Sequence, residues 1–145
     1  MKHQTQRNAI ITEALTWERT PHHNGACIKG VGVDCGKYPI AVYAACGLIP
    51  QIDVPRYSPQ FHLNRDEEWY RAIVEAHGYR VEKPLQGDFA LYKIGRIYSH
   101  GAIVIEWPRI IHANLITGVT QDVGDQGNLA NKNVLFFSPF KPEPL

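Results

Sequence analysis

The stretch GVDCGKYPIAVYAACG, residues 32–47, places a cysteine between a glycine-containing loop and a nearly all-apolar run. Pro39 lacks an N–H group and is tolerated only in the first turn of a helix, so a helix containing it begins at about residues 35–37. The run is apolar on every face, which indicates a buried helix, and Gly47 supplies the left-handed residue that ends it. Cys35 therefore lies at the N-terminal end of a buried helix, where the helix dipole favours a thiolate.

A cysteine in this position can be core filler, a disulfide partner, a metal ligand or a nucleophile. The chain has three cysteines, an odd number, at spacings that match no disulfide framework. The first twenty residues contain no apolar segment of signal-peptide length. We therefore expect a chain that is made in the cytoplasm with reduced thiols, which leaves the core, metal and nucleophile interpretations open.

Length and charge narrow the class of protein. A chain of 145 residues can bury a core, and we expect a single domain over residues 1–145 with an extended, proline-rich tail over residues 139–145. The formal net charge is +1 and no long block of like charge occurs, so the composition indicates no nucleic-acid partner. No apolar stretch approaches the length of a membrane span.

The periodicity changes from helical to strand-like along the chain. Apolar residues recur at helical spacing over residues 4–16 and 69–78, and Asn64 and Glu67 resemble a capping box before the second segment. Five strand-like segments follow, at residues 88–94, 100–107, 109–115, 118–123 and 133–139. This order predicts an α+β fold in which N-terminal helices pack on a central antiparallel sheet.

Two of the seven histidines are candidates for the base that a nucleophilic cysteine needs. His100 opens one predicted strand and His112 lies in the next, with Trp107-Pro108 at the turn between them. A three-residue connection would pair Ala102 with His112 and place His100 one pleat along on the same face, within hydrogen-bonding reach. A two-residue turn without a bulge would place the two rings on opposite faces.

Four quoted motifs occur in a recognisable order: TPHHNGACIKGVGVDC, the apolar helix after it, GDFALY, and SHGAIVIEWPRIIHA. Together they resemble the NlpC family of bacterial and phage cell-wall cysteine peptidases, and the likeness runs from about Trp17 to Ala113. The resemblance implies a papain-like α+β fold without a cofactor. It assigns Cys35 as the nucleophile, His100 as the base and His112 as the residue that orients the base.

The resemblance also implies a substrate and a setting. The substrate class is the peptidoglycan stem peptide, cut between D-glutamate and diaminopimelate. The loop before the cysteine is similar to that of phage-encoded members, which implies a place in a phage tail, tail proteins as partners and action on the cell wall. We expect His22, Asp34 and Ser99 at the substrate groove, with helix capping as the competing role of Asp34. Gly36-Lys37 departs from the Ser-Gly of many members.

Three other interpretations remain open. His22, His23, Cys27 and Cys35 lie within fourteen residues and could bind zinc, but the Cys-x7-Cys spacing does not match the short knuckle of structural zinc sites, so we expect no metal. The domain could instead be a catalytically inactive structural module of a phage tail with the same fold. It could also be an acyltransferase or amidase that uses the same triad, because fold does not determine function.

Overall fold

The computed structural model describes residues 2–52 and 68–142. Its helices are α1 (Gln4–Leu15), α2 (Lys37–Ala45), α4 (Trp69–His77) and the short 3-10 helix η1 (Gly127–Leu129). Its strands are β1 (Cys27–Ile28), β2 (Gly32–Val33), β3 (Tyr79–Val81), β4 (Phe89–Ile94), β5 (Ile97–Glu106), β6 (Arg109–Asn114), β7 (Gly118–Val123) and β8 (Val134–Ser138). No helix within these ranges is long and apolar enough to cross a membrane. The predicted capping box at Asn64 and Glu67 falls outside the described residues.

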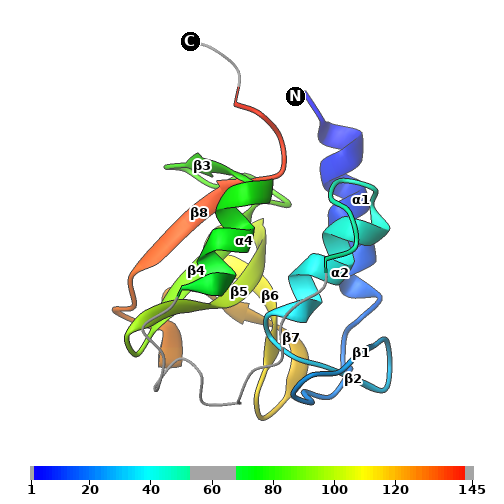
Figure 1. Cartoon of the computed structure of the whole chain (residues 1–145), viewed down its shortest axis with the longest axis vertical. Helices are drawn as coiled ribbons and strands as arrows, with labels where there is room; N and C mark the ends of the chain where they lie inside the picture. The colour runs from blue at the N-terminus through cyan, green and yellow to red at the C-terminus, as the bar shows by residue number, and fades with distance from the viewer. Residues whose placement is uncertain (1, 53–67, 143–145) are drawn as a thin grey trace.

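In the described part of the chain, six strands form one antiparallel sheet in the order β3-β8-β4-β5-β6-β7. Helices lie over one face of this sheet, with α1 and α2 stacked beside each other (Figure 1). The predicted α+β class with helices on an antiparallel sheet is confirmed. Strand β3 was not predicted, because a run of three mostly exposed residues is too short to give a strand pattern and is extended only by pairing with β8.

Both faces of the sheet are covered. The face toward the helices buries Phe89, Leu91, Ile103, Ile111, Ala113 and Phe137. The opposite face buries Ala90, Tyr92, Ala102, Val104 and Ile110 beneath Leu129 of η1. Burial on both faces explains why the central strands read as continuous apolar runs rather than as alternating ones.

Helix α2 begins and ends as its sequence predicts. Gly36 is the N-cap, so Pro39 lies in the first turn, where its missing N–H leaves no hydrogen bond unmade. Gly47 has a φ of 72°, the left-handed conformation of a residue that follows a helix C-terminus. Cys35 thus precedes the N-cap directly.

Two tyrosines of α2 join the helix to its neighbours. The buried Tyr38 hydroxyl donates to the Ala14 carbonyl of α1 at 2.9 Å. The Tyr43 hydroxyl donates to the Gly87 carbonyl, just before β4, also at 2.9 Å. Buried hydroxyls need such partners, so these bonds select one position of α2 against α1 and the sheet.

A buried ion pair connects α1 to the start of β4. Nη1 of Arg7 donates to Oδ1 of Asp88 at 2.7 Å, and the two side chains are 7% and 1% exposed. Oδ2 of Asp88 accepts the Leu85 amide at 2.8 Å, and Arg7 also donates to the Gln86 carbonyl. Asp88, which the sequence suggests only as the start of a strand, therefore attaches the sheet to the first helix.

The predicted extended tail is anchored where the structure describes it. Phe140 is 7% exposed, and the His3 ring stacks on it with a centroid distance of 4.3 Å. The Arg7 guanidinium lies 5.0 Å from the centre of the same ring. The first residues after β8 thus pack on the beginning of α1, while residues 143–145 are outside the described ranges.

We expect Arg7→Ala to lower the free energy of unfolding by roughly 3–5 kcal/mol, because it leaves the buried Asp88 carboxylate without its cation. The matched control is Glu75→Gln, which removes a half-exposed ion pair with Arg71 on α4 and is expected to cost about 0–1 kcal/mol. Equilibrium urea unfolding of the two variants measures both values. Similar losses in the two variants would contradict the assigned role of the buried pair.

Candidate functional site

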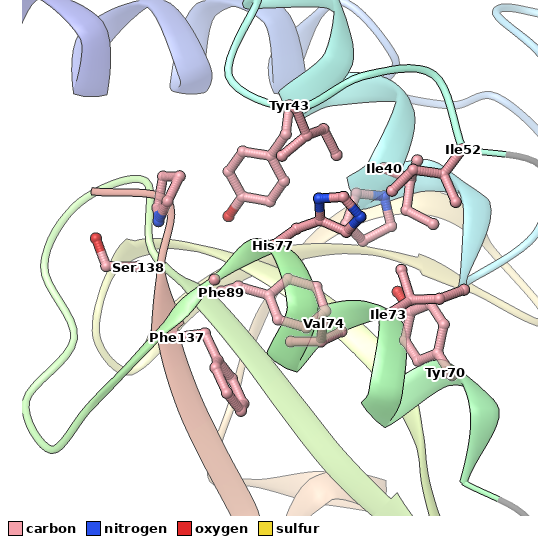
Figure 2. A pocket seen from close by; sticks show the side chains of 14 residues that line it. Ile40, Tyr43, Ile52, Tyr70, Ile73, Val74, His77, Phe89, Phe137 and Ser138 are labelled. Carbon is pink, nitrogen blue, oxygen red and sulfur yellow. The ribbon is translucent and has the colours of Figure 1, made fainter. Parts of the chain in front are cut away.

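One cavity, of about 50 Å³, lies between α2, α4 and the sheet. Figure 2 shows Ile40 and Tyr43 of α2 across it from Ile73 and Val74 of α4, with Phe89 of the sheet beside them. The described residues that line it include no cysteine and no carboxylate. Its described lining is mostly apolar, and it contains none of the candidate site residues of the sequence analysis.

A larger cleft, of about 500 Å³, contains the residues that the sequence singles out. Cys35 reaches it from the turn before α2, His100 from β5 and His112 from β6. The three expected substrate-binding residues also line it: His22, Asp34 and Ser99. The fold thus brings all six predicted residues to one cleft, although they are spread from the first loop to the sixth strand.

Asp34 organises the turn that carries Cys35. Its side chain is buried, and Oδ1 accepts the backbone amides of Gly36 at 3.1 Å and Lys37 at 2.8 Å. Oδ2 accepts the amide of Gly25 at 2.9 Å, and the Lys37 ammonium donates to the Gly25 carbonyl. These bonds support the capping role of Asp34, whereas contact with a substrate stays a prediction.

The thiol of Cys35 does not have the lowered pKa that its place before a helix predicts. Burial, followed by the nearby Asp34 carboxylate, raises the pKa of the Cys35 thiol to about 12. The backbone N–H groups of Cys35 and Gly36 act in the opposite direction, but more weakly. Desolvation of a charged sulfur thus outweighs the helix N-terminus here, because the sulfur lies against the packed core.

Tyr70 of α4 binds the turn that carries Cys35, a role that its sequence context does not reveal. It is 1% exposed, and its hydroxyl donates to the carbonyl of Gly36 at 2.9 Å. Gly101 makes room for it: a Cβ there would lie 2.7 Å from the Tyr70 hydroxyl and 2.6 Å from the ring of Phe89. The residue after His100 therefore has to be a glycine if Tyr70 is to reach the turn that carries Cys35.

The hairpin that carries the two histidines differs from the predicted one in the length of its turn. Glu106 pairs with Arg109, so Trp107 and Pro108 form a two-residue turn rather than part of a three-residue connection. A bulge between Val104 and Glu106 then shifts the register by one residue. The predicted connection is wrong, but the bulge has the same effect on the register as one more turn residue.

The shifted register places both histidines on one face. Ile103 pairs with Ile111, and Nε2 of His100 lies 2.8 Å from Nδ1 of His112. The rings meet edge to face, with centroids 5.0 Å apart. On the other side of His100, Tyr92 of β4 is its strand partner, with ring centroids 6.1 Å apart.

A carboxylate that the sequence reasoning missed completes this line of side chains. Nε2 of His112 lies 3.0 Å from Oδ2 of Asp122 on β7, whose side chain is 44% exposed and also lines the cleft. In the β6–β7 pairing, Ile110 is opposite Asp122 and His112 is opposite Thr120. The even spacing of Asp122 from His112 across a short hairpin was the available signal, since alternate residues share a face.

The first loop contributes two further histidines, His22 and His23. His22 lines the cleft, and burial lowers its pKa although the Asp34 carboxylate acts in the opposite direction. His23 and Cys27 are exposed. Within residues 2–52 and 68–142, no group of three or more histidine, cysteine or carboxylate side chains converges as metal ligands do.

No protein-family model matches the sequence, and no curated protein matches it. Solved structures do match. The NlpC/p60 domain of peptidoglycan hydrolase SagA superposes with a TM-score of 0.61 at 20% sequence identity, over 89% of this chain and 96% of that one.

Two further structures agree. A Staphylococcus aureus protein of the NLP/P60 family, named as similar to a lipoprotein, gives a TM-score of 0.64 at 19% identity over 96% of this chain and 43% of its own. The P60 domain of an M. avium paratuberculosis antigen superposes with a TM-score of 0.56 at 14% sequence identity, over 92% of this chain and 93% of that one. This chain has the NlpC/p60 fold. At these identities the likeness establishes the fold, and the chemistry has to be argued from the cleft.

In this NlpC/p60 fold, Tyr70→Phe is expected to lower the free energy of unfolding by about 1–3 kcal/mol, because the buried Gly36 carbonyl loses its donor. Tyr79→Phe, on the exposed edge strand β3, is the matched control and is expected to stay within about 0.5 kcal/mol of the unmodified protein. Urea unfolding separates the two. A loss of unfolding free energy in Tyr70→Phe as small as that of the control would show that the Tyr70 hydroxyl does not stabilise the turn that carries Cys35.

The pKa of His112 generates a second prediction. Burial lowers the pKa of His112 from its ordinary value of 6.5. The ring is therefore protonated less readily in the folded protein than in the unfolded one. This contribution to stability is present above pH 6.5 and is lost as the pH falls, by up to about 1.4 kcal/mol per pH unit. The free energy of unfolding should therefore differ less between pH 7.5 and pH 5.0 in His112→Asn than in the unmodified protein. His23→Asn controls for the loss of an exposed imidazole; an equal difference in all three proteins would contradict the prediction.

Proposed function

We propose that this protein is a cysteine peptidase that hydrolyses an amide bond of peptidoglycan. The observation that carries the proposal is a single cleft that holds a helix-mounted cysteine, Cys35, together with the hydrogen-bonded pair of His100 and His112. Supporting it, the fold is shared with a solved domain of a peptidoglycan hydrolase. Cys35 is the nucleophile, His100 the general base and acid, and His112 the residue that orients His100.

The raised pKa of Cys35 decides how the reaction starts. With a pKa of about 12 the sulfur carries its proton at neutral pH, so the nucleophile is generated only when a base removes that proton. His100 accepts it as the sulfur attacks the carbonyl carbon of the substrate. This order differs from the thiolate that the position of Cys35 before a helix favours.

The attack produces a tetrahedral intermediate with a negatively charged oxygen. The Gly36 amide already donates to Asp34, so we assign the Cys35 N–H as a donor to the oxyanion. His100 then gives its proton to the leaving nitrogen, the C–N bond breaks and a thioester remains on Cys35. Water, losing a proton to His100, attacks the thioester and releases the new carboxylate together with the free thiol.

The stem peptide fits the chemistry of the cleft wall. Several neutral polar side chains and one lysine line it beyond the triad: Asn24, Asn114, Gln126, Asn128 and Lys132. Amides can bond peptide groups, and the ammonium suits the carboxylates that D-glutamate and diaminopimelate carry. We place the scissile bond between these two residues. For the setting we propose a phage tail with other tail proteins as partners, on the basis of the phage-like loop before Cys35.

Purified peptidoglycan tests the proposal. The unmodified protein should release new amino groups and fragments whose masses identify the bond cut, whereas Cys35→Ala should reduce release at least 1000-fold, since no other group replaces the nucleophile. Cys27→Ala, which alters an exposed cysteine, is the matched control and should keep full activity. Activity that survives in Cys35→Ala would overturn the mechanism.

Other outcomes separate the competing functions. A folded protein that leaves peptidoglycan intact under all conditions would favour the inactive structural module. Products that carry an added amine in place of a new carboxylate would identify an acyltransferase that uses the same thioester.

A further inference from the structure

We propose that Asp122 is a positioning residue that selects the tautomers of both histidines, so that Nδ1 of His100, rather than Nε2, is the base that serves Cys35. The inference rests on the proposed function, because it concerns how the same site holds its proton. It adds a fourth residue, from β7, to the three that the resemblance implies.

The Asp122 carboxylate determines the tautomer of His112. An ionised carboxylate only accepts hydrogen bonds, so the 3.0 Å contact between Oδ2 of Asp122 and Nε2 of His112 requires the proton of His112 to be on Nε2. A neutral imidazole has one N–H and one lone pair. Nδ1 of His112 therefore presents its lone pair toward β5.

The tautomer of His112 in turn determines that of His100. Nε2 of His100 lies 2.8 Å from that lone pair, so His100 has to donate from Nε2. Its own lone pair is consequently on Nδ1. Of the two nitrogens of His100, only Nδ1 is then able to accept the proton of the Cys35 thiol.

A charged His112 would reverse this order. An imidazolium donates from both nitrogens, which would force Nε2 of His100 to accept and would place the His100 proton on Nδ1, where a base is needed. The ring of His112 is 3% exposed, and burial lowers its pKa more than the Asp122 hydrogen bond raises it. The partly exposed Asp122 thus orients a neutral ring rather than forming a buried ion pair with it.

The arrangement also serves the protonated state. After His100 accepts the proton from sulfur, its Nε2–H still donates to His112, whose Nε2–H donates to Asp122. No hydrogen bond has to be exchanged during the step, so the two outer residues can stay in place while the charge on His100 appears and disappears.

Nitrogen-15 NMR of the imidazoles tests the tautomers without any substrate. At pH 7.5 we expect protonated Nε2 and unprotonated Nδ1 for both rings, with the signals assigned from His100→Ala and His112→Asn. In Asp122→Ala, His112 should shift measurably toward the Nδ1–H tautomer. A wild-type His112 protonated on Nδ1, or a pattern unchanged in Asp122→Ala, would overturn the proposal.

Kinetics provide the second readout. Asp122→Ala should lower kcat for peptidoglycan at least ten-fold with little change in KM, and Asp122→Glu should recover part of the loss because it keeps an acceptor. Asp125→Ala removes an exposed carboxylate three residues away and is the matched control, with kcat unchanged. An unchanged kcat in Asp122→Ala would also overturn the proposal. Because the NMR result needs no turnover, it stands or fails independently of the peptidoglycan assay.

Discussion

The register between β5 and β6 is the constraint on which the site depends. A slip of one residue in an antiparallel pair turns every side chain of a strand to the other face. The bulge between Val104 and Glu106 prevents that slip after a two-residue turn, and the 2.8 Å contact between His100 and His112 exists only in the resulting register. Both faces of the two strands bury apolar residues, so the apolar pattern alone does not select this register and the bulge is needed.

Cys35, which we propose as the nucleophile, is held by a different set of bonds. Asp34 binds three backbone amides around the turn, Tyr70 binds the Gly36 carbonyl, and α2 is attached to α1 and the sheet by its tyrosines. This rigidity has a cost, because the core that positions Cys35 also desolvates its sulfur and raises the pKa of the thiol. In the mechanism we propose, a base that is already oriented, His100, compensates for a Cys35 thiol that is not already charged.

The sequence predicts what local chemistry determines and misses what distant pairing determines. Pro39 and Gly47 delimit α2 because their backbone preferences act within one turn. The sequence predicts the shared face of His100 and His112 through a three-residue connection, whereas the structure reaches it by a two-residue turn and a bulge. The pKa of Cys35 could not be predicted, since desolvation depends on how tightly the rest of the chain packs around it.

The missed site residues have the same explanation. Tyr70 belongs to a helix whose periodicity indicates only a core position, and its bond to Gly36 spans 34 residues of sequence. Asp122 belongs to a strand whose apolar pattern is weak, so the sequence does not define its register. Strand β3 becomes a strand only through β8, which lies more than fifty residues later in the chain.

The position of β8 between β3 and β4 has a consequence for the order of folding. Until residues 134–138 have been synthesised, β4 has no neighbour on one side and β3 has none at all. A nascent chain that already contains Cys35, His100 and His112 would therefore expose an open edge in the middle of its future sheet. Pairings this distant in sequence form slowly. The sheet that supports the histidines is thus complete only once β8 has been synthesised, although the β5–β6–β7 hairpins that carry them are local.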